Sequence, residues 1–136
     1  MALIPVKNGP AVVVCSRCRL SAESSEGPDG RRGGALLAEA VARLHADDPA
    51  YADVAVQEMP CLFACRDHCT VLLRAPGKIG YVLGRFEPTE EAARAILDFA
   101  RAYAASEIGQ VPFRDWPEGV KGHFLTRQPP EGYIVE

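Results

Sequence analysis

The chain has 136 residues, 48% of them apolar and 24% charged, which is the composition of one soluble globular domain with a sizeable core. Its formal net charge of −3 argues against nucleic acid or an anionic membrane as the partner. No apolar run is long enough to span a membrane, and the first residues lack the pattern of a secretory signal. We therefore expect a cytoplasmic protein that binds neither nucleic acid nor membrane.

The first half of the chain predicts a strand, a helix and a second strand. Residues 11–15 (AVVVC) are a short apolar run and predict a buried strand, whereas residues 21–34 are rich in serine and glycine and predict an exposed loop. Apolar side chains recur at helical spacing over residues 35–48, and Pro49 ends that helix. Residues 51–59 alternate valine with smaller or polar residues, as a strand does.

The second half predicts a hairpin, a helix and an extension. Residues 70–75 and 79–86 are strand-like and flank Pro-Gly-Lys at 76–78, which favours a turn. Residues 88–107 carry the clearest helical pattern, with two glutamates near the start and an apolar stripe. Residues 108–136 contain four prolines and no period, so we expect an irregular C-terminal tail.

The predicted element order is β-α-β-β-β-α. A β-α-β unit places two parallel strands in one sheet through a right-handed crossover, and a hairpin adds antiparallel strands. We therefore predict an α/β fold, a thioredoxin-like mixed sheet with helices packed on it. The expected domain covers residues 1–107, and residues 108–136 form a Pro-rich extension packed on it through aromatic side chains.

Five cysteines are the main chemical feature of the sequence. Cys15 and Cys18 form a C-x-x-C pair after the first predicted strand, Cys61 and Cys65 form a C-x-x-x-C pair before the third, and Cys69 follows. In a reducing compartment, such pairs indicate a metal site or a catalytic site rather than disulfides. Both pairs occupy loops at an end of the predicted sheet, where the fold can bring them together.

Three kinds of chemistry use such cysteines. A dithiol site needs its first thiolate at a helix N-terminus, and the sixteen residues between Cys18 and the helical pattern at Ala35 argue against helix capping of Cys15. A structural zinc site would use both pairs, although a C-x-x-x-C half is less typical of zinc. An iron–sulfur cluster uses four thiolates over a wider span, which suits the unequal spacings. The spacings favour the cluster and leave zinc and the dithiol as alternatives.

The segment CLFAC at 61–65, followed by TVLL at 70–73, is similar to a segment of thioredoxin-like [2Fe-2S] ferredoxins and of the related subunit of respiratory complex I. This resemblance implies a [2Fe-2S] cofactor with four ligands, Cys15, Cys18, Cys61 and Cys65. It implies that Cys69 is a non-ligand or a substitute ligand. Phe63 replaces a glycine that is usual in those ferredoxins. A homodimer is implied by this resemblance alone.

The whole chain also resembles a bacterial family of predicted metal-binding proteins, domain of unknown function 1636. The resemblance runs through four segments: VCSRCR at 14–19, GKIGYVLGRF at 77–86, LDFARAYAASEIGQVPFR at 97–114 and RQPP at 127–130. It implies metal binding and a loose association with cobalamin metabolism and cobalt insertion.

The residues and the two resemblances lead to one functional expectation. We expect a [2Fe-2S] ferredoxin-like electron carrier, or a redox or iron sensor, that serves a larger redox partner and is not itself an enzyme. A zinc- or cobalt-handling protein and a thioredoxin-like dithiol oxidoreductase are the alternatives. Arg17, Arg19 and Arg66 flank the cysteines and would stabilise the negative charge of a cluster. The acidic net charge suggests that the partner presents a basic patch.

Overall fold

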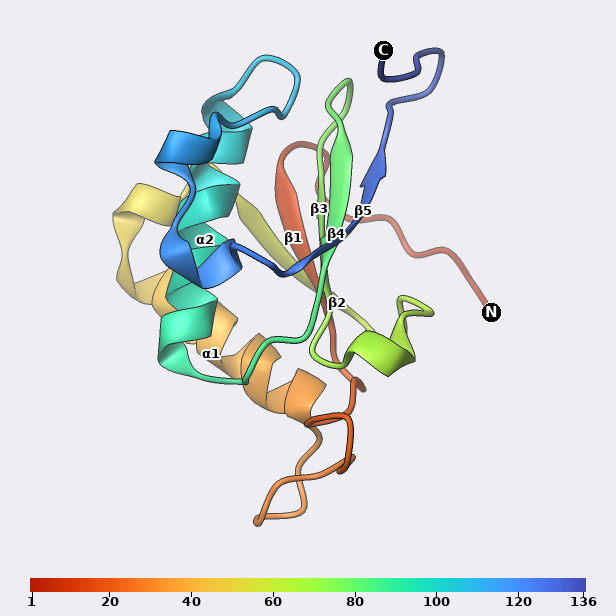
Figure 1. Cartoon of the computed structure of the whole chain (residues 1–136), viewed down its shortest axis with the longest axis vertical. Coiled ribbons are helices and arrows are strands. Elements are labelled where there is room, and N and C mark those ends of the chain that lie inside the picture. Colours follow the sequence, from red (N-terminus) through yellow and green to blue (C-terminus); the bar gives the residue numbers. More distant parts are fainter.

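The strands form one mixed sheet with the order β2-β1-β3-β4-β5 in the computed structural model, which describes residues 1–136 (Figure 1). The helices and strands in chain order are β1 (Ala11–Cys15), α1 (Gly33–Asp47), β2 (Ala55–Met59), β3 (Val71–Arg74), β4 (Gly80–Leu83), α2 (Glu90–Ala105) and β5 (Phe124–Gln128). β1 pairs in parallel with β2, and the other three strand pairings are antiparallel. The predicted α/β class and the order of the first six elements are therefore confirmed.

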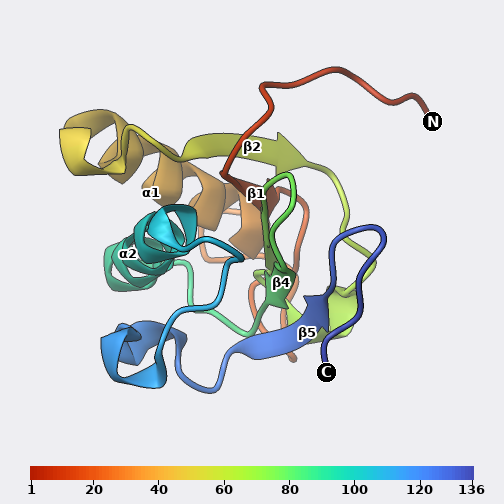
Figure 2. The same cartoon turned by 90° about the horizontal axis from the view of Figure 1, so that it is seen from above.

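Both helices pack on the same face of the sheet and contact each other (Figure 2). The core lies between the helices and the sheet. Val12 and Val14 of β1 face this core, where they join Leu37 and Val41 of α1 and Phe99 of α2, and each of the five is at most 1% exposed. β-Branched residues suit the centre of a sheet, and burial of this apolar surface is the main term that favours folding.

α2 begins at Glu90 because Thr89 caps it. The hydroxyl of Thr89 accepts a hydrogen bond from the backbone N–H of Ala92 at 3.1 Å. Glu90 and Glu91 place negative charge at the positive end of the helix dipole. Neither α1 nor α2 has the length and apolar character that crossing a membrane requires.

The C-terminal residues differ in part from the sequence prediction. Residues 124–128, which the sequence placed in an irregular tail, form β5 and pair with β4. The strand was missed because FLTRQ is short and ends in polar side chains, as an exposed edge strand does. Phe124 packs against the core with Trp116, and the two ring centroids lie 4.6 Å apart. The indole N–H of Trp116 donates to the carbonyl oxygen of Val111 at 2.8 Å.

Candidate metal centre

The end of β1 meets the segment that follows β2, and the five cysteines lie in these two regions. The backbone N–H of Cys15 donates to the carbonyl oxygen of Thr70 at 3.0 Å. The N–H of Ser16 donates to the carbonyl oxygen of Met59, the last residue of β2, at 2.9 Å. These contacts join the turn after β1 to residues 60–70, which carry the second cysteine pair. The two pairs are therefore brought to one end of the sheet (Figure 1).

Cys15 and Cys18 form the inner pair, and both are 2% exposed. Cys18 Sγ lies 3.1 Å from the hydroxyl of Thr70 and accepts the N–H of Thr70 at 3.5 Å. A hydrogen bond from the Cys18 thiol lowers the pKa of Cys15 to about 6; burial opposes this shift, and the N–H groups of Leu62 and Arg17 assist it. The contact with Cys15, together with burial, raises the pKa of Cys18. Cys15 is therefore the thiolate of the pair.

Cys61 and Cys65 form the outer pair, in which Cys61 is half-buried and Cys65 is exposed. Their Sγ atoms lie 3.9 Å apart. Two thiolates on one tetrahedral metal ion, with metal–sulfur bonds of about 2.3 Å, lie about 3.8 Å apart. The outer pair thus has the separation of two ligands of one metal ion. The backbone N–H of Phe63 donates to Cys61 Sγ at 3.2 Å.

Cys69 stands apart from both pairs. It is fully buried, and its thiol donates to the carbonyl oxygen of Arg19 at 3.4 Å. Burial, and after it the charge of Cys15, raises the pKa of Cys69 to about 12. The Cys69 thiol is therefore engaged by the backbone.

The N-terminus of α1 packs against the turn between Cys15 and Cys18. The N–H of Gly34 donates to the carbonyl oxygen of Cys18 at 3.0 Å. A Cβ on Gly34 would clash with the carbonyl oxygen of Cys15, and a Cβ on Gly33 would lie 2.6 Å from the carbonyl oxygen of Arg19. Two glycines therefore allow this close approach. The first turn of α1 has no acidic residue, so the positive end of its dipole faces the cysteine turn uncompensated.

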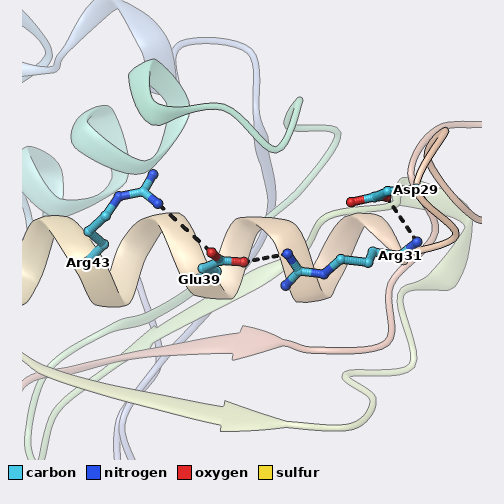
Figure 3. Close-up of polar contacts among 4 residues, drawn as sticks. All are labelled: Asp29, Arg31, Glu39 and Arg43. Atoms are coloured by element: carbon cyan, nitrogen blue, oxygen red, sulfur yellow. Dashed lines mark hydrogen bonds and ion pairs between the residues drawn. The ribbon is translucent and has the colours of Figure 1, made fainter.

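The N-terminus of α1 therefore lies against the turn despite the sixteen intervening residues, although its N–H group bonds to the backbone of Cys18 and not to Cys15 Sγ. The intervening loop folds back onto the turn. Arg32 Nε donates to the carbonyl oxygen of Arg17 at 2.7 Å. Arg31 forms an ion pair with Glu39 of α1 at 2.6 Å, which holds the loop against the helix (Figure 3). Separation along the chain was a poor measure of distance because this loop returns to its starting point.

Arg85 and Phe63 shape the site through their backbone conformations. Arg85 was not among the predicted site residues, and Phe63 was noted only because it replaces a glycine that is usual in the similar ferredoxins. Arg85 has a φ of +65°, and its N–H donates to the carbonyl oxygens of Asp67 at 2.6 Å and His68 at 2.8 Å. Phe63 has a φ of +59°. Left-handed backbone at such residues stores strain and is concentrated at functional sites. The Gly-Gly pair at 33–34 was a sequence signal for close backbone packing, whereas no pattern indicated the conformation of Arg85.

The thiols are arranged as two pairs rather than as one cage. No three His, Cys, Asp or Glu side chains of the chain are grouped so that they could hold one metal ion. A single structural zinc ion needs all four sulfurs around one centre. A [2Fe-2S] cluster instead takes two thiolates on each of two irons, and backbone N–H donors to sulfur stabilise it. The chain thus offers the number and type of donors that a dinuclear cluster needs.

The mixed sheet and the paired cysteines at the end of its first strand define an α/β protein with a candidate metal site. The chain belongs to the family described as Protein of unknown function (DUF1636), whose model matches residues 12–130. No curated protein matches the chain.

Two solved structures share the fold. The structure of a thioredoxin-like [2Fe-2S] ferredoxin from Aquifex aeolicus has a TM-score of 0.54 at 17% identity, and the match covers 94% of this chain and 100% of the ferredoxin chain. The crystal structure of the wild-type thioredoxin-like [2Fe-2S] ferredoxin from Aquifex aeolicus has a TM-score of 0.50 at 20% identity, over 70% of this chain and 88% of that one. The predicted family and the predicted thioredoxin-like fold are confirmed by these matches.

Proposed function

We propose that this protein binds a [2Fe-2S] cluster and works as a ferredoxin-like carrier of one electron or as a redox sensor. The observation that carries the proposal is the meeting of two cysteine pairs at the end of β1, with Cys61 and Cys65 already at a ligand-like separation of 3.9 Å. The similarity of the fold to proteins whose titles name them [2Fe-2S] ferredoxins supports the same assignment.

In this proposal each cysteine pair holds one iron. Cys15 and Cys18 hold the inner iron, because both sulfurs lie in the buried turn after β1. Cys61 and Cys65 hold the outer iron, because Cys65 is exposed. Cys69 is not a ligand, since its thiol is bonded to the carbonyl oxygen of Arg19. When bound, the cluster supplies a centre that accepts and releases one electron.

The surroundings of the four sulfurs suit a negatively charged group. The N–H groups of Thr70 and Phe63 donate to Cys18 and Cys61. The N-terminus of α1 brings the positive end of a helix dipole against the inner turn. Four thiolates on an oxidised two-iron, two-sulfide core carry a charge of about −2, which these donors offset.

The exposure of the outer pair suits exchange of an electron with a separate redox protein. Cys65 lies at the surface, so a partner can approach the outer iron closely without any rearrangement of the core. A homodimer and a link to cobalamin metabolism stay predictions, because both rest on resemblance and no residue described above bears on them.

One observation favours a second candidate, a dithiol oxidoreductase. The N-terminus of α1 lies against the Cys15–Cys18 turn, as the chemistry of a reactive dithiol requires. In that reaction the Cys15 thiolate attacks a substrate disulfide and forms a mixed disulfide. Cys18 then displaces the substrate thiol, and the oxidised Cys15–Cys18 disulfide remains. This candidate leaves the outer pair without a role.

A series of single cysteine variants tests the proposed ligand set. Cys15→Ala, Cys18→Ala, Cys61→Ala and Cys65→Ala, expressed with iron supply and purified anaerobically, should lose the visible absorption and most of the iron. Cys69→Ala is the matched control and should keep both. Loss of the chromophore in the control, with its retention in one of the four, would show that the assignment is wrong. Disulfide reductase activity that requires Cys15 but tolerates Cys61→Ala would favour the dithiol.

A further inference from the structure

The two outer thiols lie against each other and can be joined by a local movement. Cys61 Sγ and Cys65 Sγ are 3.9 Å apart, and a disulfide joins two sulfurs at about 2.0 Å. The N–H of Phe63 donates to Cys61 Sγ, which holds this sulfur over the turn that leads to Cys65. A movement of about 2 Å, shared between two side chains and the turn that joins them, would therefore bring the sulfurs into bonding distance.

The turn between the two cysteines can make this movement without loss of core packing. Residues 61–64 belong to no helix or strand, and none of them is buried. The Phe63 side chain is 91% exposed, so its ring has no core contact to lose. The residues that follow Cys65 are held in place, because the N–H of Arg85 donates to the carbonyl oxygen of Asp67 at 2.6 Å. Closure of the pair therefore needs a shift of the exposed turn alone.

The outer pair is the part of the site that a dissolved oxidant can reach. Cys65 is exposed and Cys61 is half-buried, whereas each of the other three cysteines is at most 2% exposed. Cys65 also lines an open hollow between residues 62–67 and the strands β4 and β5. A small disulfide such as oxidised glutathione can therefore meet the outer sulfurs before the buried ones, since thiol reactivity depends on access.

We propose that Cys61 and Cys65 of the metal-free protein are a site of reversible oxidation, which a small disulfide such as oxidised glutathione closes into an intramolecular disulfide. The thiolate of one cysteine attacks glutathione disulfide, forms a mixed disulfide and releases one glutathione. The thiolate of the other cysteine then attacks the protein sulfur of the mixed disulfide and releases the second glutathione. Two protein thiols thus lose two electrons and two protons, and one glutathione disulfide becomes two thiols.

The disulfide and a metal ion compete for the same two sulfurs. A metal ligand must be a thiolate, and a sulfur in a disulfide is not one. The consequence for the cluster rests on the proposed function. A closed outer pair leaves Cys15 and Cys18 without the ligands of the second iron, so the cluster cannot assemble until the disulfide is reduced. Oxidation of the outer pair therefore makes cluster loading depend on the surrounding thiol–disulfide balance.

Thiol mapping of the metal-free full chain tests the oxidation site. The protein is treated with a chelator, reduced, freed of reductant anaerobically and mixed with oxidised glutathione. Samples taken over time are quenched in acid, alkylated in denaturant and analysed by peptide mass spectrometry. Cys61 and Cys65 should become protected together, at least about tenfold faster than the three buried cysteines. Equal rates at all five cysteines would overturn the proposal, as would faster oxidation of Cys15 and Cys18, which would favour the dithiol candidate.

Single variants identify the two sulfurs of the disulfide. Cys61→Ser and Cys65→Ser should each fail to form it and should hold at most one glutathione, because the second thiol that releases glutathione is missing. Cys69→Ser is the matched control and should form the disulfide at the wild-type rate, since the Cys69 thiol is bonded to the carbonyl oxygen of Arg19. A disulfide in either outer variant, or its loss in the control, would overturn the assignment.

Cluster assembly is measured on the same preparations, without added thiol. The reduced protein should take up iron and sulfide. Protein in which only the outer pair is closed should take up less than about a tenth as much until dithiothreitol is added. Equal uptake by the two forms would overturn the competition between disulfide and metal. Absence of iron uptake by the reduced form would count against the proposed function, whereas the thiol map alone decides on the oxidation site.

Discussion

Thr70 holds Cys18 through both its side chain and its backbone. The hydroxyl lies 3.1 Å from Cys18 Sγ, and the backbone N–H donates to the same sulfur at 3.5 Å. The carbonyl oxygen of Thr70 accepts the N–H of Cys15. Thr70 is also the only buried polar residue in the protein apart from cysteines and tyrosines. One residue directly before β3 therefore positions the inner cysteine pair.

Replacement of Thr70 by valine should lower the reduction potential of the bound cluster. Valine keeps the shape of threonine but removes the hydroxyl that can donate to the Cys18 thiolate. Such a donor stabilises the additional negative charge of the reduced state. We expect a change of about tenfold in the reduction equilibrium, or about 59 mV for one electron, measured by a redox titration of the visible spectrum. Thr70→Ser should restore the wild-type potential, and an unchanged potential in Thr70→Val would contradict this role.

Replacement of Gly34 by alanine should destabilise the protein and the site together. The new Cβ would collide with the carbonyl oxygen of Cys15 and would lie 2.6 Å from the nitrogen of Cys18. We expect a loss of about 1–3 kcal/mol in the free energy of unfolding, measured by urea denaturation, together with reduced iron content. Gly27→Ala is the control, because its Cβ would make only ordinary contacts from 3.5 Å. Equal stabilities of the two variants would show that the helix does not abut the turn.

The reactivity of Cys15 in the metal-free protein should depend on pH in a defined direction. The thiolate is the form that is alkylated, and the Cys18 thiol lowers the pKa of Cys15 to about 6. The rate of iodoacetamide labelling at Cys15, followed by peptide mass spectrometry, should therefore rise through about pH 6 and level off above it. Cys18→Ala removes the donor and should move the midpoint to higher pH. A wild-type midpoint near the ordinary cysteine value of about 8.5 would be inconsistent with the hydrogen bond.

Removal of residues 108–136, the Pro-rich extension that the sequence predicts to pack on the domain, should prevent folding. Val111 and Val120 belong to the core, Trp116 and Phe124 pack against it, and β5 covers the edge of β4. The truncated chain should lose cooperative thermal unfolding in circular dichroism. Removal of residues 131–136 alone is the control and should change the stability by less than about 0.5 kcal/mol, because these residues are exposed. A stable 1–107 fragment would contradict this prediction.

The sequence predicted the elements whose residues carry a local pattern. Local residue patterns predicted the valine-rich strand β1, the helix α2 with its apolar stripe and the turn at Pro76–Lys78. The order of these elements then predicted the mixed sheet. β5 was missed because its pairing with β4 provides most of its stability, and the residues FLTRQ alone have little strand character. Its assignment depends on a contact between distant segments that no window of the sequence contains.

The candidate site was likewise predicted where the sequence carries a local pattern and missed where contacts between distant segments decide the structure. The C-x-x-C and C-x-x-x-C spacings marked the cysteines, and strand ends in a shared sheet placed them at one end. The return of the 19–32 loop and the left-handed backbone of Arg85 are set by tertiary contacts, so the sequence did not reveal them.

Iron and acid-labile sulfide analysis of the anaerobically purified wild-type protein, with its visible spectrum, tests the central claim most directly. The account predicts a coloured protein with about two irons and two sulfides per chain, whose absorption bleaches on reduction by one electron. A colourless protein that contains one zinc ion and no sulfide would contradict it.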